Sequence, residues 1–355
     1  MDRWQIYANS LRCHSINSYC FSKLWFKCGS IDLRQGDIAK ITSLAKSWVY
    51  ADLLVKPDEI TLYRPRSKGG LNLIHVKYRA MAEQIKYFID TAVNPNYPCN
   101  IYHKALYEWF VEENSLMKNP GKSPYFTQDF FQAIKAVKEQ ESLSIKHFSI
   151  GMWYRALLNL YVLTEKDDDG FVFEKCSKLE QGHSQTSWDS TWNVVCHPSL
   201  ESADHSFLFC LLHDLLPTQL ILAKVLRAHY STNVCGLCDL QVSGDQLHSF
   251  LICPFNNGVG LWLKECMRRS WPALQDTQVL NLNFGTDSSE IQKVAATWLV
   301  AKTFGCIWKS RLQKKQSCIR LVRAKVEADI QILRKSRYGD VALAVEKFGL
   351  EHNVS

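Results

Sequence analysis

Three cysteines and one histidine between residues 235 and 253 have the types and the spacing of a metal site. Two residues separate Cys235 from Cys238, nine separate Cys238 from His248, and four separate His248 from Cys253. Two thiolates on one tight turn can reach a single Zn²⁺ ion at about 2.3 Å, and a histidine and a cysteine from a following short helix can complete a tetrahedron. Four protein ligands leave no position open for a substrate, so the pattern predicts a structural Zn²⁺ site.

The alternative interpretation is three buried, reduced cysteines and a histidine satisfied by neighbouring groups. A Cys-x-x-Cys turn followed by a histidine and a cysteine at this spacing seldom arises by chance, so the metal site is favoured. His229 and Cys266 lie close by in the sequence and are the substitutes if one of the four residues does not serve as a ligand.

The sequence lacks the common motifs of catalysis. It has no phosphate-binding glycine loop, no His-Glu-x-x-His motif and no Gly-x-Ser-x-Gly elbow. Tyr50 and Asp52 look like the start of a polymerase metal-binding motif, but Leu53 stands where that motif needs a second carboxylate. Glu290 and Lys293 are too few to build a nuclease. We therefore expect a protein that is not an enzyme on its own and has no small-molecule substrate.

Basic residues are concentrated toward the end of the chain. Between Lys302 and Arg337, six lysines and five arginines stand against two acidic residues, a local charge of +9, while the whole chain carries +7 and the remainder therefore −2. Such a segment is typical of surfaces that bind polyanions, although many charge runs are only the solvated face of a helix. RNA, DNA or both are the expected partners. The candidate phosphate contacts are Lys309, Arg311, Lys314, Lys315, Arg320 and Arg323.

The composition favours a globular protein of two or three units. The chain has 355 residues, of which 46% are hydrophobic and 22% charged, and its 16 glycines and 10 prolines are too few for a collagen-like or linker-dominated chain. Thirteen cysteines without an export signal favour reduced thiols, and so an intracellular location, cytoplasmic or nuclear. The apolar runs 207–225 and 298–308 are interrupted or too short to span a bilayer, so no membrane partner is expected.

Apolar periodicity predicts a mainly α fold. Residues recur at helical spacing over 38–48, 157–162 and 294–307. Short β-rich runs at 59–63 and 71–74 flank a glycine turn at 68–70 and predict a β-hairpin, and 170–173 is a further short strand. These elements would combine into helical bundles with a small β-hairpin and a zinc-stapled module.

The residues around the metal pattern also form a recognisable set. Ahead of it stand His213, Leu215, Pro217 and Thr218, and after it Pro254 and Trp262. Together they resemble the zinc-binding segment that follows the reverse transcriptase of LINE-type (non-LTR) retrotransposons, in which an H-x-L-x-P-T helix precedes the ligands and a tryptophan ends the segment. The family's acidic residue ahead of the histidine is absent, and Asp245 is the nearest equivalent.

The earlier part of the chain is similar to the same family. Segments 16–18 and 22–25, with Trp48, look like the start of the thumb that follows the polymerase palm, and 60–65 with 69–73 resembles a Gly-Gly-Leu hairpin. The resemblance covers essentially the whole chain. It divides the chain into a thumb-like helical segment (1–55), a hairpin and following helix (56–90), a helical linker region (91–200), a reverse-transcriptase-type zinc-binding domain (201–270) and a basic helical tail (271–355).

In the family, fingers and palm precede these elements, and the palm carries the catalytic carboxylates. The resemblance thus implies a C-terminal portion of a retrotransposon reverse transcriptase that binds template RNA or target DNA. Such a portion would not polymerise alone and would have a palm-bearing reverse transcriptase chain as a partner. Three alternatives stay open. One is a zinc-stabilised protein-interaction module, and another is an enzyme, either a remnant polymerase acting in trans with a palm-bearing chain or a nuclease built around Glu290. The third is a truncated retrotransposon copy without function.

Overall fold

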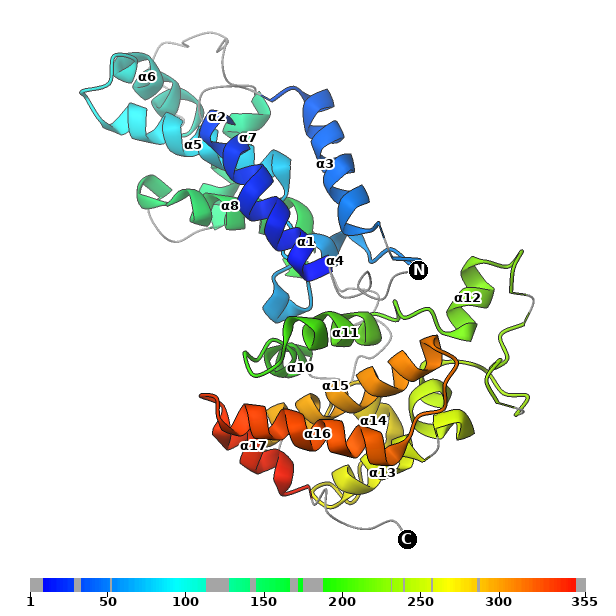
Figure 1. Ribbon diagram of the computed structural model, residues 1–355. Coiled ribbons are helices and arrows are strands. Elements are labelled where there is room, and N and C mark those ends of the chain that lie inside the picture. Colours follow the sequence, from blue (N-terminus) through cyan, green and yellow to red (C-terminus); the bar gives the residue numbers. More distant parts are fainter. Residues whose placement is uncertain are drawn as a thin grey trace.

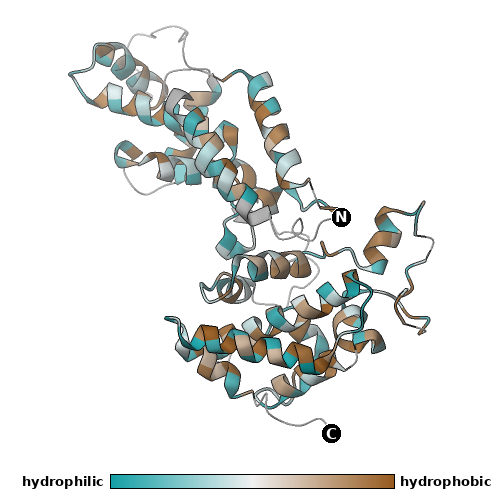
Figure 2. Ribbon diagram, in the orientation of Figure 1, coloured by the Kyte–Doolittle hydropathy of each residue, from teal (hydrophilic) through white to brown (hydrophobic). Residues whose placement is uncertain are grey.

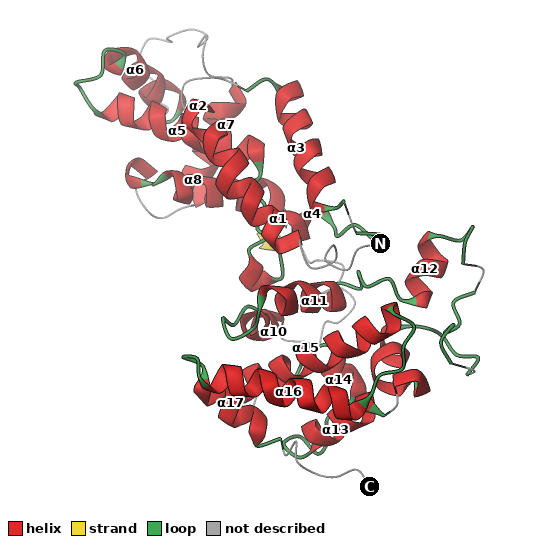
Figure 3. Cartoon of the chain, in the orientation of Figure 1, coloured by secondary structure: helices red, strands yellow, loops and turns green. Residues whose placement is uncertain are grey.

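In the computed structural model the described part of the chain is mainly helical (Figures 1 and 3). The prediction of a mainly α fold is confirmed. The structure describes residues 9–28, 33–51, 53–112, 128–140, 145–166, 172–174, 188–230, 232–238, 240–256, 258–285 and 288–348. Within these ranges, no helix is long and apolar enough to cross a bilayer.

The first half of the chain forms the upper helical body of Figure 1. Its helices are α1 (Asn9–Ser15), α2 (Ser22–Cys28), α3 (Gln35–Val49), α4 (Glu59–Tyr63), α5 (Val76–Val93), α6 (Asn100–Phe110), α7 (Gln128–Gln140) and α8 (Ile150–Leu158). Helix α5 packs against α6, α7 and α8. These four helices enclose a core of their own, in which Phe88, Leu106 and Trp153 are fully buried. Much of region 91–200, predicted as a linker, thus contributes to a hydrophobic core.

The second half surrounds one long helix, α15. Its helices are α10 (Trp188–Val195), α11 (Ser202–Leu212), α12 (Gln219–Val225), α13 (Val259–Arg268), α14 (Asp276–Leu280), α15 (Glu290–Leu312), α16 (Ile319–Arg334) and α17 (Gly339–Glu346). Ser289 caps α15, accepting a 3.3 Å hydrogen bond from the N–H of Gln292. Every residue from Val294 to Phe304 is buried, as expected for a helix with α10, α11, α13, α16 and α17 against it. By contrast, α16 is buried along one face only, which carries Val322, Val326, Ile330 and Leu333, and polar residues lie among its other positions (Figure 2).

The prediction of a β-hairpin from 59–63 and 71–74 is wrong, because residues 59–63 form helix α4. The carboxylate of Asp58 accepts a 2.7 Å hydrogen bond from the N–H of Thr61 and so caps that helix. A capping aspartate accepts a hydrogen bond from an N–H group at the start of a helix. In an extended strand, the same N–H group would have to pair with a neighbouring strand. Of the residues that indicated a strand, Thr61, Leu62 and Tyr63 are instead buried within one helical turn.

The chain does reverse direction at the predicted glycine turn. Gly69 has φ of +75°, in the left-handed region that favours glycine. After the turn, the N–H groups of residues 71, 72 and 73 donate to backbone carbonyls of Thr61, Arg64 and Leu62, at 2.8 to 3.0 Å. The returning segment therefore lies beside the end of a helix and is not paired with a strand.

The antiparallel pair that the structure does contain lies further along the chain. Strand β1 (Thr164–Lys166) pairs with β2 (Val172–Glu174), with Glu165 opposite Phe173. The strand predicted at 170–173 therefore overlaps β2 in part, and residues 170 and 171 lie outside the described part of the chain.

The glycine turn joins the two halves of the molecule. A side chain on Gly69 would overlap the ring of Trp192 in α10, and one on Gly70 would overlap the carbonyl of Arg64. The Nε2 atom of His213, which follows α11, donates a 2.9 Å hydrogen bond to the carbonyl of Gly69. Two motifs that lie far apart in the sequence, the Gly-Gly-Leu turn and the helix ahead of the metal pattern, are therefore in direct contact.

Candidate metal centre and the neighbouring basic surface

The first two metal-site cysteines lie on a closed loop. Val234 forms an antiparallel bridge with Ser243, and the N–H of Cys235 donates to the carbonyl of Val242 at 3.0 Å. The bridge brings the two ends of the loop together, so both thiols of the Cys-x-x-Cys turn belong to one closed loop.

The other two residues lie at the ends of a short π-helical turn, η5 (His248–Ile252): His248 is its first residue and Cys253 follows its last. The carboxylate of Asp245 accepts a 2.8 Å hydrogen bond from the N–H of His248 and fixes the start of the turn. At its end, the N–H of Cys253 donates to the carbonyl of His248 at 2.8 Å. Asp245 thus fixes the backbone of His248.

The structure brings all four predicted residues together. Their ligand atoms lie within 4.8 Å of one another, and we call Cys235, Cys238, His248 and Cys253 the metal cluster. The sulfur atoms of Cys235 and Cys253 are 3.9 Å apart, and the sulfur of Cys238 is 3.4 Å from Nε2 of His248. A tetrahedral Zn²⁺ site with ordinary bond lengths has sulfur–sulfur edges of about 3.8 Å and sulfur–nitrogen edges of about 3.6 Å. These two separations match the edges of such a site, and the remaining pairs of ligand atoms lie within 4.8 Å of one another.

The two substitute ligands are not part of the cluster. His229 is exposed, and Cys266 is buried within α13, where it belongs to the hydrophobic core. By contrast, Cys235 is 3%, Cys253 4% and His248 5% exposed, so three of the four cluster residues are shielded from water. Such a closed set of ligands suits a structural ion and leaves little room for a substrate.

We call the loop closed by Val234 and Ser243, together with η5 and Cys253, the metal module. This module packs against the C-terminal part of α15. The ring of Phe250, in η5, lies 4.8 Å from that of Phe304 and 5.8 Å from that of Trp308, measured between ring centres. On its other side, α13 approaches closely through Gly260, where a Cβ atom would lie 2.5 Å from the carbonyl of Phe250. The position of the cluster is therefore coupled to the helix that leads into the basic segment.

A positive charge lies beside the cluster. The Nη2 atom of Arg311 donates to the sulfur of Cys235 at 3.4 Å. Burial raises the pKa of the Cys235 thiol, but the backbone hydrogen bond of Leu237 and the Arg311 guanidinium outweigh it, and the pKa is lowered. Burial, with a further contribution from the neighbouring thiols, raises the pKa of Cys238 to about 11. Burial also lowers the pKa of His248, which keeps its imidazole neutral and able to bind a metal.

The candidate phosphate contacts lie where α15 ends and α16 begins. Four of them are exposed, and we call these four the basic surface: Lys309, Lys314, Lys315 and Arg320. Arg323 is half-buried on α16, and Arg311 is half-buried against the metal cluster. Since Arg311 and Lys309 belong to the last turn of the same helix, the basic surface directly adjoins the metal module.

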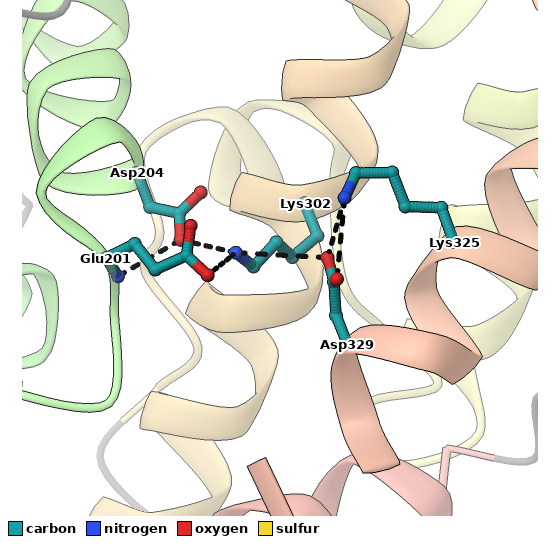
Figure 4. A network of polar contacts seen from close by, with 5 residues as sticks. All are labelled: Glu201, Asp204, Lys302, Lys325 and Asp329. Carbon is teal, nitrogen blue, oxygen red and sulfur yellow. Dashed lines mark hydrogen bonds and ion pairs between the residues drawn. The ribbon is translucent and has the colours of Figure 1, made fainter. Parts of the chain in front are cut away.

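Other members of the basic segment have partners inside the protein. Lys302 is 7% exposed and lies between the carboxylates of Glu201, Asp204 and Asp329 (Figure 4). Lys325 forms an ion pair with the same Asp329 at 3.1 Å. The surface charge of this segment is therefore smaller than its sequence count indicates. Lys302 lies inside the apolar run 298–308, which indicates burial, but the sequence does not identify its partners, because they come from two other helices.

The chain matches no protein-family model and no curated protein sequence.

Proposed function

We propose that the protein binds nucleic acid through the basic surface and that a structural Zn²⁺ ion in the metal cluster holds this surface in place. The observation that supports the proposal most strongly is the adjacency of the two features. Arg311, one turn or less from Lys309 and Lys314, donates to a sulfur of the cluster at 3.4 Å. The metal cluster and the exposed basic residues therefore meet at the same end of α15.

The chemistry of the two features is complementary. Zn²⁺ with three thiolates and one imidazole has its four positions filled, so the ion contributes folding free energy and no reaction step. Exposed lysine and arginine side chains neutralise phosphates and release counterions, which gives affinity without requiring a particular base sequence. The basic surface thus supports a binding role rather than catalysis.

By the resemblance to LINE-type retrotransposons, we further propose that the bound nucleic acid is template RNA or target DNA. On this proposal the chain is the C-terminal portion of a reverse transcriptase and does not polymerise alone. A palm-bearing reverse transcriptase chain is then its protein partner, in a reducing intracellular compartment. The contact between the Gly-Gly-Leu turn and His213 supports this, because two separate motifs of the resemblance act as one structural unit.

The test is binding of single-stranded RNA across a salt series by two matched variants. The first replaces Lys309, Lys314, Lys315 and Arg320 by glutamine. The second makes the same change at four exposed lysines elsewhere, Lys23, Lys40, Lys56 and Lys347. Both variants lose the same net charge.

The proposal predicts that only the first variant changes the salt dependence substantially. Each lost phosphate contact on a single strand removes about 0.7 from the log–log salt slope, so four contacts remove roughly 3. An equal and small change in both variants would place the contacts elsewhere and would contradict the proposal.

A protein-binding role is the second candidate, and one observation favours it. Leu321 and Ile332 are 72% and 69% exposed, and their spacing of 11 residues, about three helical turns, puts both on one face of α16. Affinity for a protein partner that changes little with salt and falls when both residues are replaced by serine would favour this candidate over nucleic-acid binding.

A further inference from the structure

Arg311 differs from the other basic residues near the end of α15 in what its side chain contacts. Its Nη2 atom donates to the sulfur of Cys235, which lies 76 residues earlier in the chain. Its Nη1 atom is buried and, among the residues that the structure describes, has no hydrogen-bond partner. Because both terminal nitrogens of Arg311 face the protein interior, its guanidinium is poorly placed to bind a phosphate of a nucleic acid.

The charge of a filled metal cluster explains this inward position. Zn²⁺ bound by three thiolates and a neutral imidazole carries one net negative charge, and three of the four ligand residues here are buried. A buried charge is costly unless it is paired and hydrogen-bonded. The guanidinium supplies one positive charge and an N–H donor to a ligand sulfur, so the metal centre and Arg311 together are neutral.

Resting on the proposed Zn²⁺ site, we infer that Arg311 is a positioning residue that acts as the outer-shell partner of the metal–thiolate centre, and that it is not one of the phosphate contacts. It connects the ion to the last turn of α15 and so to the turn that carries Lys314 and Lys315. Outer-shell partners orient the ligands and tune the electron density that they donate to the metal.

The packing around Arg311 supports a fixed position. Trp308, one turn earlier in α15, lies 3% exposed with its ring against Phe250 of η5. The same face of the helix thus carries an apolar contact to the metal module and, one turn later, an ionic contact to its ligand. Lys309 is exposed on the other side of this helical turn and provides a matched control.

The experiment compares Arg311→Met, Arg311→Lys and Lys309→Met in the full chain. Zn²⁺ affinity is measured by competition with a chromogenic chelator. We expect Arg311→Met to weaken Zn²⁺ binding about 10- to 100-fold, as is typical for loss of an outer-shell partner. Arg311→Lys should restore part of the affinity, because it keeps the charge but not the planar donor, and Lys309→Met should leave the affinity unchanged.

Two further readouts separate this role from a merely structural one. In protein loaded with Co²⁺, the sulfur-to-cobalt charge-transfer band of Arg311→Met should move to longer wavelength than in the wild type, because a sulfur without its N–H donor gives up electrons more readily. At saturating Zn²⁺, Arg311→Met should bind single-stranded RNA with the salt slope of the wild type, whereas Lys309→Met should reduce that slope.

The outcomes are distinguishable. If Arg311→Met and Lys309→Met have equal Zn²⁺ affinity and equal cobalt spectra, the inference is overturned while the metal site stands. If Arg311→Met keeps its Zn²⁺ affinity but loses salt slope, Arg311 is a phosphate contact. If the wild type binds neither Zn²⁺ nor Co²⁺, both the proposed site and this inference are overturned. Should Arg311→Met not fold, the cobalt spectrum and Zn²⁺ affinity of Arg311→Lys decide the question.

Discussion

The ammonium group of Lys302 lies 2.9 Å from a carboxylate oxygen of Asp204, and both side chains are nearly buried between α15 and α11. Glu201 and Asp329 approach the same ammonium at 3.3 and 3.9 Å (Figure 4). Burial alone would lower the pKa of Lys302, but the three carboxylates outweigh it and the pKa is raised. Burial raises the pKa of Asp204 as well, and Lys302 offsets that effect only in part. The ion pairs of the buried Lys302 therefore connect α15 to α11 and α16.

We predict that Lys302→Met destabilises the protein by about 3–5 kcal/mol, because it leaves Asp204 buried without a counter-charge. Urea unfolding at neutral pH measures the change. Lys325→Met is the control: it removes an exposed partner of the same Asp329 and should cost no more than about 1 kcal/mol. The double variant Lys302→Met with Asp204→Leu should recover much of the loss. Equal losses in the two single variants would contradict the assignment.

Gly70 should tolerate no side chain, since a Cβ atom would overlap the backbone carbonyl of Arg64. We expect Gly70→Ala to lower the free energy of unfolding by about 1–3 kcal/mol, the usual cost of overpacking. Gly305→Ala, inside α15 where nothing lies within 4 Å of the new atom, should instead raise it by up to about 1 kcal/mol. Chemical denaturation of both variants is the measurement. A Gly70→Ala protein as stable as the wild type would show that this turn is not closely packed.

Acid should destabilise the first half of the chain through His75. Its ring lies between those of Tyr63 and Tyr78, at 4.5 and 4.6 Å between ring centres, and burial lowers its pKa to about 4. The unfolded chain takes up the proton near pH 6.5, so between these values it binds more protons than the folded chain. Stability is therefore full above about pH 6.5 and falls by roughly 3 kcal/mol as the pH falls to about 4.

The check is His75→Phe, which keeps an aromatic ring between the two tyrosines and removes the titrating nitrogen. Between pH 7.5 and pH 4.5 the variant should lose about 2–3 kcal/mol less stability than the wild type. Identical pH profiles for the two proteins would show that His75 is not responsible.

Loss of one metal ligand should unfold the metal module. If the metal cluster binds Zn²⁺ as proposed, Cys253→Ser replaces a buried sulfur ligand by a poorer oxygen ligand, so metal content after dialysis should fall from one Zn²⁺ per chain to near zero. The melting temperature should fall as well, since metal-binding free energy is folding free energy in such modules. Cys20→Ser, at an exposed cysteine outside the cluster, should change neither value. Equal metal content in the two variants would exclude the cluster as the site.

The sequence could predict those features that depend on near neighbours in the chain. The spacing from Cys235 to Cys253 covers 19 consecutive residues, so turn geometry and ligand chemistry suffice to predict that these residues meet. Helix α15 was predictable for the same reason, because its apolar residues recur within a few turns. The hairpin prediction failed where two local signals competed: β-branched residues favoured a strand, and the cap at Asp58 favoured a helix.

Features that depend on distant partners could not be predicted. Arg311 meets Cys235 across 76 residues, and Lys302 meets Asp204 across nearly 100, so neither pair leaves a local pattern. The count of basic residues treats Lys302, Arg311 and Lys314 alike, although one is buried in an ion pair, one faces a ligand sulfur and one is exposed. Only the fold distinguishes them.

The most direct test of the central claim is the affinity of the purified chain for single-stranded RNA across a salt series, before and after Zn²⁺ is removed with a chelator. Our account predicts a straight log–log decline with salt for the Zn²⁺-loaded protein, and a large loss of affinity and slope when the metal is removed and the module unfolds. RNA binding that is absent at low salt, or that is unchanged by complete removal of the metal, would contradict it.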